Sequence, residues 1–423
     1  MVKKSLAIGL AVVSAACAAI FCPNCGNTHV SAAASDLNIT AKAAYLVEAN
    51  SGKIIFAKDE HKRLPIASMV KITTLAVIYD ALESGQIHMD DKVMVSREAS
   101  GMGGSQAFLD FDTEYSVEDL LKSIIIASAN DSCIAMAELI AGSESEFVGR
   151  MNELAAKLGL TDTNYVNCTG LPAANSYSSS ADVAKMYQYI MKSPFYSYEV
   201  AWDPEIAAQA EPADAEQNQN PIDDGSKKPM NLIWMYNLVH PSGRVTGLTN
   251  TNKHVRFFNG CTGGKTGYTA EAGHCITVSA LRGSIRPVAV IIGGSDSATR
   301  FKESGDLMNY VFNNYENKLI VDKNQKIGTV RVKNAFEDNI DVYAKENYFD
   351  LVKKGDKRDA GPTVNVEFVK SAKAPINRDT ALGKIIVTDE GAVIKEIDVV
   401  SKAAVEGMNY WDAVKKVTRS YKF

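Results

Sequence analysis

Three short groups of residues in this 423-residue chain carry side chains suited to acyl transfer. In chain order they are Ser68-Met69-Val70-Lys71, Ser128-Ala129-Asn130 and Lys265-Thr266-Gly267. A serine hydroxyl is nearly inert as a nucleophile at neutral pH and needs an adjacent base. Lys71 lies three residues after Ser68, so both side chains share one face of a helix that begins near Ser68. We interpret Ser68 as a nucleophile and Lys71 as its base, which requires burial or a nearby positive charge to lower the pKa of Lys71.

The order of the three groups resembles the active-site signature of penicillin-recognising serine enzymes. Ser68 and Ser128 lie 60 residues apart, and Lys265 follows after a further 137. The flanking residues 65–67 and 263–269 are similar to those of the D-alanyl-D-alanine carboxypeptidases, low-molecular-mass penicillin-binding proteins that trim cell-wall peptides. The resemblance is specific over residues 38–318 and extends to the remainder only in overall arrangement.

The resemblance implies roles for the other motif residues. Ser128 would transfer a proton toward the leaving group, and Asn130 would hold the substrate amide. Lys265 and Thr266 would bind the terminal carboxylate of the substrate, and the charge of Lys265 would help to lower the pKa of Lys71. No metal and no cofactor are expected.

The end of the third motif is expected to form the wall of the cleft. Gly267 leaves room for the ligand backbone to lie along the strand. Backbone N–H groups of Ser68 and Tyr268 would form the oxyanion hole. The chain departs from the family pattern in two places, with Ala129 where glycine is common and Tyr268 where histidine is common. The second departure touches the lip of the carboxylate site and bears on substrate preference.

Ordinary structural roles are the alternative for each group. Ser68 would then be an N-cap and Lys71 a solvated helix residue. Ser128 and Asn130 would cap a helix that starts at residue 132. Asp131 has no chemical role in the family pattern, and we expect it at the helix start.

The favoured function is that of a serine-type D-Ala-D-Ala carboxypeptidase. The peptidoglycan stem peptide would acylate Ser68, D-alanine would leave, and water would hydrolyse the acyl-enzyme. Beta-lactam antibiotics mimic this substrate and should acylate the same serine. The alternatives are a DD-endopeptidase on cross-linked peptides, and a secreted penicillin-binding sensor or scaffold with little turnover. A class A β-lactamase is disfavoured because no clear deacylating glutamate follows Leu171.

Residues 1–34 are interpreted as a secretory signal peptide. Lys3 and Lys4 supply its positive start, residues 6–21 are apolar and uncharged, and Ala32-Ala33-Ala34 offers a cleavage site. The alternatives are a retained membrane anchor and a lipoprotein at Cys17. The interpretation implies export, with the enzyme associated with the outer face of the cytoplasmic membrane.

Composition is that of an ordinary globular protein, with 46% hydrophobic and 22% charged residues. Removal of two lysines with the signal peptide changes the formal net charge from −5 to −7. An acidic chain argues against a general nucleic-acid binder. The mature chain keeps an even number of cysteines, which permits disulfides or free buried thiols and leaves the pairing open: Cys133, Cys168, Cys261 and Cys275.

The fold class expected for residues 35–317 is α+β, a penicillin-binding/β-lactamase-like catalytic domain with an antiparallel sheet and helices on both faces. Apolar patterns predict a hairpin around Asn50-Ser51-Gly52, strands at 275–281 and 288–292, and several helices. The helices are expected from 68 to 84, from 117 to 128, from 132 to 140 and from 301 to 315. Polar residues suggest a solvated insertion at 204–229. Short apolar runs predict a small β-rich domain at 318–402.

Residues 403–423 form a basic amphipathic tail. Its apolar residues recur at helical spacing: Tyr410, Val414, Val417 and Tyr421, with Trp411 beside them. Four basic residues and Asp412 give residues 409–423 a net charge of +3. This pattern favours peripheral docking on an anionic membrane surface. The alternative is a terminal helix packed on the β-rich domain, or a frayed tail.

Overall fold

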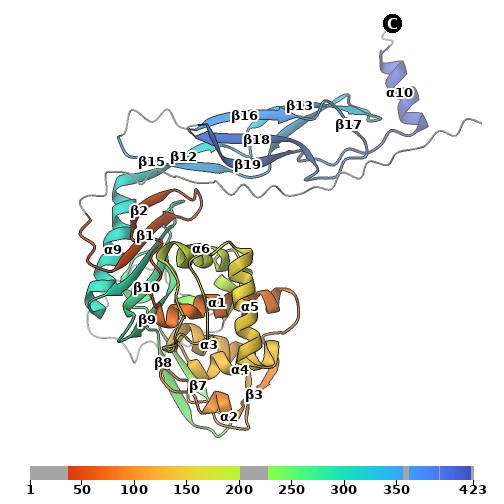
Figure 1. The fold of residues 1–423 in the computed structure, drawn as a ribbon. Helices are drawn as coiled ribbons and strands as arrows, with labels where there is room; N and C mark the ends of the chain where they lie inside the picture. The colour runs from red at the N-terminus through yellow and green to blue at the C-terminus, as the bar shows by residue number, and fades with distance from the viewer. Residues whose placement is uncertain (1–36, 201–226, 356–361, 390, 421–423) are drawn as a thin grey trace, which may run out of the picture.

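The computed structural model describes residues 37–200, 227–355, 362–389 and 391–420. The expected signal peptide, residues 204–226 of the expected insertion and Tyr421 lie outside the described residues. Within the described part, an N-terminal region of sheet and helices is followed by a β-rich region and a terminal helix (Figure 1).

The N-terminal region is built on a five-stranded antiparallel sheet in the order β2-β1-β11-β10-β9. The strands are β1 (Ala43–Glu48), β2 (Ile54–Lys58), β9 (Cys261–Thr269), β10 (Gly273–Ala280) and β11 (Pro287–Gly294). The predicted hairpin and the two predicted strands are confirmed.

Strand β11 shows why the sheet is covered on both faces. Val288, Val290 and Ile292 belong to one buried core, and Ala289 and Ile291 belong to another. Side chains alternate across a strand, so a continuous apolar run needs apolar partners on both sides. Helix α9 (Ser297–Asn314) packs on one face and α6 (Ser180–Ile190) on the other.

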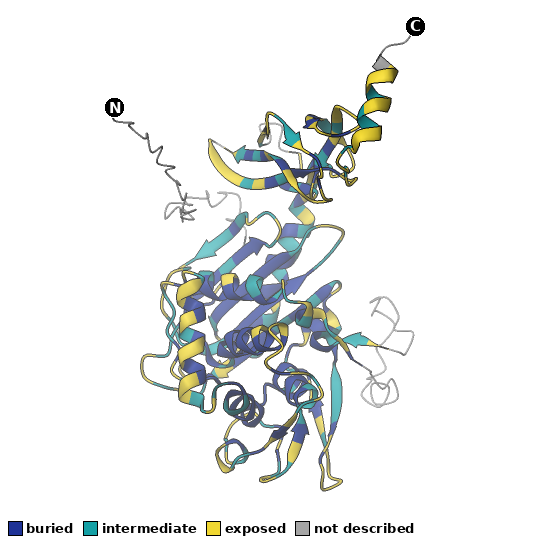
Figure 2. Ribbon diagram, turned by 90° about the vertical axis from the view of Figure 1, so that its right-hand side faces the viewer, coloured by how far each residue is buried: buried dark blue, intermediate teal, exposed yellow. Residues whose placement is uncertain are grey.

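Helix α1 (Lys71–Glu83) lies in the middle of the helical layer, and every residue in it except Asp80 and Glu83 is buried (Figure 2). A helix that is apolar around its whole circumference needs neighbours on all sides. Helices α4 (Asn130–Ala141), α5 (Glu144–Lys157) and α6 supply them, and α3 (Val117–Ala127) packs against α4.

Three predicted helix starts differ from the structure. Ser68 lies on a 3-10 turn, η2 (Ala67–Val70), and the α-helix itself begins at Lys71. Helix α4 begins at Asn130, two residues earlier than predicted. Helix α9 begins at Ser297 because the side chain of Asp296 accepts the N–H of Thr299, which makes a strong N-cap.

Shorter elements complete the N-terminal region. They are β3 (Lys92–Met94), α2 (Arg97–Ser100), β4 (Glu114–Ser116), η3 (Pro194–Ser197), β5 (Glu199–Val200), β6 (Lys228–Pro229), η5 (Met230–Leu232), β7 (Met235–Val239), β8 (Val245–Thr249) and α8 (His254–Phe257). Strands β7 and β8 form a hairpin.

The β-rich region contains a strand pair and a six-stranded sheet. The pair is β12 (Tyr315–Val321) and β15 (Tyr348–Lys353). The sheet, in spatial order, is β16 (Thr363–Phe368), β18 (Ala381–Asp389), β19 (Ala392–Val400), β14 (Asn339–Ala344), β13 (Lys326–Lys333) and β17 (Ala372–Lys373). Helix α10 (Tyr410–Ser420) stands at the far end of this region from α9 (Figure 1).

The cysteines of the described residues form no disulfide. Cys133, Cys168, Cys261 and Cys275 are all free and buried. They behave as small apolar residues of the core, which is the usual state of an unpaired buried cysteine.

Candidate active site

Ser68 lies half-buried on η2, at the N-terminal end of α1. Ala67, which precedes it, has a φ of +50°, a left-handed conformation that is uncommon for a residue with a side chain. Glycines border this turn on both sides. A Cβ on Gly170 would lie 2.1 Å from Ala67 O, and a Cβ on Gly267 would lie 3.0 Å from Ser68 N. The serine turn is therefore held between strand β9 and the turn at Gly170, with no space for a side chain on either.

Three oxygen atoms surround the side-chain nitrogen of Lys71. Its Nζ lies 3.1 Å from Ser68 Oγ, 2.7 Å from Asn130 Oδ1 and 2.5 Å from Thr169 O. Lys71 is completely buried, and this burial lowers its pKa because the charged form loses hydration. The structure therefore joins the first and second motifs through one lysine.

The second motif is shaped by a left-handed residue. Ser128 follows α3 with a φ of +62° and turns the chain so that α4 starts at Asn130. Ser128 Oγ is buried and has no hydrogen-bond partner among the described residues. Asn130 Nδ2 donates to Gly103 O at 2.7 Å. The helix N-cap is Ala129, without a side-chain bond, so the capping alternative for Ser128 and Asn130 is wrong.

The third motif lies on β9, which ends the sheet. Lys265 is buried, and its Nζ donates to Thr266 O at 2.9 Å. Burial lowers the pKa of Lys265 strongly, and the charges of Lys71 and Arg300 lower it further. Thr266 Oγ1 donates to Thr251 Oγ1 at 2.8 Å.

Tyr268, the residue after the third motif, is 59% exposed. Its ring stacks on that of His274, with 4.3 Å between the ring centroids. The two rings come from the paired strands β9 and β10, where Tyr268 and His274 are direct register partners. The tyrosine side chain is thus held at the end of the strand while its ring stays accessible.

Sequence reasoning missed two contributors to this site. Arg300, on α9, donates through Nη1 to Gly267 O at 3.0 Å and to Cys275 O at 3.2 Å, and so braces β9 from behind. Thr169 acts on Lys71 through its backbone carbonyl. Neither could be found from a motif, because one is a lone arginine and the other contributes no side chain.

These groups can transfer an acyl group to a hydroxyl. A serine on a helix-start turn faces a buried amine. The buried hydroxyl of Ser128 has no partner among the described residues, and a second buried lysine, Lys265, lies on the edge strand β9. Fold and site together define a serine enzyme of the acyl-transfer class.

Comparison with known proteins identifies the family. Residues 28–296 match the family model described as D-alanyl-D-alanine carboxypeptidase, and residues 315–407 match penicillin-binding protein 5, C-terminal domain. D-alanyl-D-alanine carboxypeptidase DacF of Bacillus subtilis (strain 168) is 35% identical over 369 residues, which covers 87% of this chain and 86% of the relative. DacD of Escherichia coli (strain K12) is 27% identical over 376 residues, 87% of each chain.

A solved structure agrees with this result. Penicillin-binding protein 5 from Haemophilus influenzae superimposes with a TM-score of 0.64 at 25% identity, covering 87% of this chain and 98% of that chain. The chain belongs to the D-alanyl-D-alanine carboxypeptidase family of low-molecular-mass penicillin-binding proteins.

Family membership confirms the predicted fold class, an α+β penicillin-binding/β-lactamase-like domain followed by a β-rich domain. It also confirms the predicted function: the protein is a serine-type D-Ala-D-Ala carboxypeptidase that binds penicillin. The family acts outside the cytoplasm on peptides of peptidoglycan. Within the described residues, no helix combines the length and apolar character needed to cross a membrane.

Proposed function

We propose that Ser68 attacks the D-Ala-D-Ala bond of a peptidoglycan stem peptide while Lys71 takes its proton. The bonding of Lys71 Nζ supports this assignment. A neutral lysine amine has two hydrogens and one lone pair. Asn130 Oδ1 and Thr169 O only accept, so they take the two hydrogens and leave the lone pair for the Ser68 hydroxyl. Burial favours this neutral form of Lys71.

The unpaired hydroxyl of Ser128 fits the next step. Ser68 Oγ forms an ester with the carbonyl carbon of the penultimate D-alanine, and the C–N bond to the terminal D-alanine breaks. The leaving amine needs a proton, which Ser128 passes on from Lys71. Its buried Oγ has no competing partner among the described residues. Water then hydrolyses the ester and restores Ser68.

The remaining motif residues hold the substrate. Lys265 and Thr266 bind the terminal carboxylate, and Asn130 binds the substrate amide. A bound carboxylate would offset the positive charges around Lys265 that lower its pKa, and so favour its charged form. Backbone N–H groups of Ser68 and Tyr268 form the oxyanion hole, and Gly267 keeps the path along β9 open.

The test uses the chain that begins at Ser35, with diacetyl-Lys-D-Ala-D-Ala as substrate. We expect release of free D-alanine, and addition of one penicillin G mass on incubation with that antibiotic. Ser68→Ala should lose both. Ser371→Ala, which removes a half-buried serine of the β-rich region, should keep both.

Other outcomes would contradict the nucleophile assignment or favour one of the alternative functions. A penicillin adduct in Ser68→Ala would refute the nucleophile assignment. Labelling by penicillin without D-alanine release would favour the sensor or scaffold. A higher rate on cross-linked dimer peptides than on the tripeptide would favour the endopeptidase.

We also propose that α10 docks on the membrane surface. Tyr410 and Trp411 are 74% and 68% exposed, and Val414 and Val417 are also exposed (Figure 2). Lys416 Nζ contacts Asp338 at 2.6 Å and Ala335 O at 2.9 Å, so one side of the helix is tied to the β-rich region. This attachment leaves the aromatic residues available for the headgroup layer of an anionic bilayer.

Vesicle sedimentation tests the docking. Vesicles with anionic lipid should pull down the full mature chain at low salt and release it at high salt, since the charge attraction is screened. A chain truncated after Gly407 should remain in solution. The double variant Trp411→Ser and Val417→Ser, which keeps every charge, should bind weakly. Equal binding of all three would remove the docking proposal and leave the catalytic one intact.

A further inference from the structure

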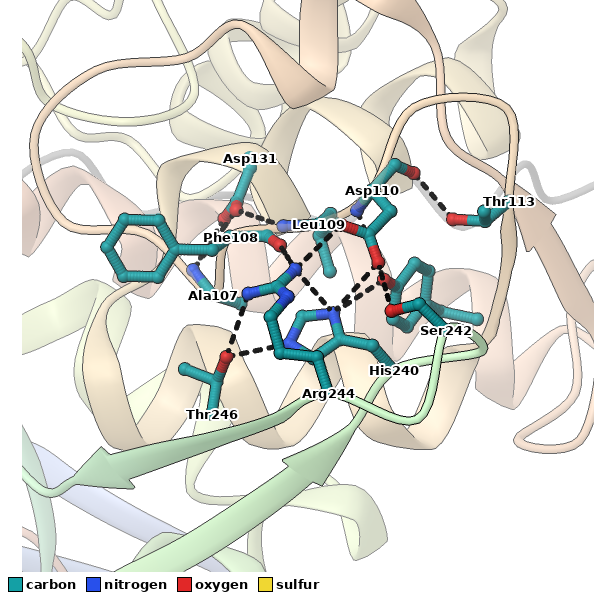
Figure 3. A network of polar contacts seen from close by, with 11 residues as sticks. Ala107, Phe108, Leu109, Asp110, Thr113, Asp131, His240, Ser242, Arg244 and Thr246 are labelled. Carbon is teal, nitrogen blue, oxygen red and sulfur yellow. Dashed lines mark hydrogen bonds and ion pairs between the residues drawn. The ribbon is translucent and has the colours of Figure 1, made fainter.

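The tip of the β7–β8 hairpin is joined to the loop before β4 by a cluster of polar side chains (Figure 3). We call this cluster the hairpin clamp; it consists of Asp110, Tyr115, His240, Arg244 and Thr246. Arg244 Nη2 lies 2.7 Å from Asp110 Oδ1. Tyr115 Oη and Thr246 Oγ1 each lie 2.7 Å from one ring nitrogen of His240.

The imidazole of His240 lies buried at the centre of the clamp. Arg244 Nη2 lies 3.1 Å from His240 Nδ1, but its two hydrogens go to the closer oxygens, Asp110 Oδ1 at 2.7 Å and Phe108 O at 2.6 Å. Both ring nitrogens of His240 thus have a hydroxyl partner, Tyr115 Oη at Nδ1 and Thr246 Oγ1 at Nε2. The His240 side chain has no exposed surface. Burial lowers the pKa of His240 and Arg244 lowers it further, while Asp110 and Asp131 act in the opposite direction.

The clamp reaches the cleft through the loop at residues 103–110. Arg244 Nη2 donates to Phe108 O at 2.6 Å. The N–H groups of Ala107 and Leu109, on either side of Phe108, donate to the buried carboxylate of Asp131 at 3.1 Å. Phe108 has a φ of +60°, an unfavourable conformation for an aromatic residue, so the loop keeps it only because bonds hold it on both sides. Asp131 was expected only at the helix start; the structure shows that it also fixes this loop.

The same loop holds Asn130 from its other end. Ser105 O accepts the N–H of Asn130 at 2.7 Å, and Gly103 O accepts from Asn130 Nδ2 at 2.7 Å. These bonds orient the amide so that Oδ1 faces Lys71 Nζ. A continuous set of hydrogen bonds and chain connections thus runs from Arg244 to Lys71.

We infer that the hairpin clamp positions Asn130 for acylation, and that Arg244 and Asp110 are positioning residues for the reaction. The inference rests on the proposed roles of Asn130 and Lys71. The clamp acts through the 103–110 loop: without it, the loop and the Asn130 amide lose their fixed orientation, and Lys71 loses one of the two acceptors that direct its lone pair to Ser68.

The test is the second-order rate of penicillin acylation, measured on the full mature chain. Arg244→Ala and Asp110→Asn should each lower this rate about 10- to 100-fold, as expected when a catalytic group shifts by about 1 Å. Arg244→Lys keeps the charge without the planar fork and should recover part of the rate. Lys326→Ala removes an ion pair of 2.6 Å in the β-rich region and serves as the matched control with an unchanged rate.

A second comparison separates positioning from general destabilisation. In an Asn130→Ala background, Arg244→Ala should cause no further loss, because the group through which it acts is gone. A further loss equal to that in the unaltered chain would overturn the inference, as would normal rates in both Arg244→Ala and Asp110→Asn. Absence of acylation in the unaltered chain would instead overturn the proposed function.

Discussion

Replacing Gly267 with alanine should slow acylation and leave the protein folded. A Cβ at this position would lie 2.7 Å from Ile66 O, whereas ordinary contact begins at 3.4 Å. Strand β9 and the serine turn must therefore separate by about 0.7 Å, the difference between these two distances. A shift of about 1 Å at reacting groups costs about 10²-fold in rate. We expect the acylation rate to fall about 10- to 100-fold.

The stability of this variant should change much less than its activity. Gly267 is not among the residues with positive φ, so its backbone accepts alanine without conformational strain. Overpacking costs about 1–3 kcal/mol, against a total stability of about 5–15 kcal/mol for a typical domain. The thermal transition of the N-terminal region should therefore stay cooperative and move to a moderately lower temperature.

The assay is stopped-flow acylation by a chromogenic β-lactam, paired with thermal unfolding of the same sample. The control is Gly149→Ala on α5, where an added Cβ has no neighbour within 4 Å. That change should leave the rate unaltered and stabilise the helix by up to about 1 kcal/mol. An acylation rate in Gly267→Ala within twofold of the unaltered chain would show that β9 does not set the geometry of Ser68.

Three further predictions follow from the same contacts. Gly170→Ala places a Cβ 2.1 Å from Ala67 O, at a backbone φ of +80°. Both the unfolding temperature and the acylation rate should therefore fall, and an unchanged unfolding temperature would contradict this prediction. Acylation should rise with pH as Lys71 loses its proton and should level off below pH 10.5, because burial lowers the pKa of Lys71. Lys71→Ala should abolish this rise and lower the rate about 10²–10⁴-fold, and a rise that persists in Lys71→Ala would exclude Lys71 as the base. Asp131→Ala leaves the N–H groups of Ala107 and Leu109 unpaired, at a cost of about 1–3 kcal/mol each. Urea unfolding should therefore show a clear loss of stability. An unchanged stability would mean that water replaces the carboxylate.

The sequence predicted the motif residues because each motif is local. Ser68 and Lys71 lie on one turn, and residues 265–267 lie on one strand, so spacing alone relates them. The apolar run at residues 288–292 likewise indicated the strand that the structure shows as β11. These features depend on neighbours in the chain, which a sequence displays directly.

The remaining features depend on neighbours in space. The 3-10 turn at Ser68 continues the apolar spacing of α1, so the pattern could not separate them. The left-handed Ala67 is imposed by the packing of Gly170 and β9 and not by any preference of alanine. Thr169 accepts the hydrogen bond from Lys71 through its backbone carbonyl, a group that every residue has. Only the fold distinguishes that carbonyl from all the others.

The buried cysteines allow local opening of the structure to be measured by the rate at which their thiols are alkylated. Only the thiolate reacts with alkylating reagents, and burial raises the pKa of Cys133 and Cys261 to about 12. Each thiol should therefore remain unreactive until the structure around it opens locally, so its labelling rate reports how often this local opening occurs. Cys133 lies on α4 with Asn130, and Cys261 begins β9, so the two report separately on the helix of the second motif and on the strand of the third. An antibiotic that stabilises only one of these two elements would lower the alkylation rate of the cysteine on that element alone, and no engineered probe is needed to detect this.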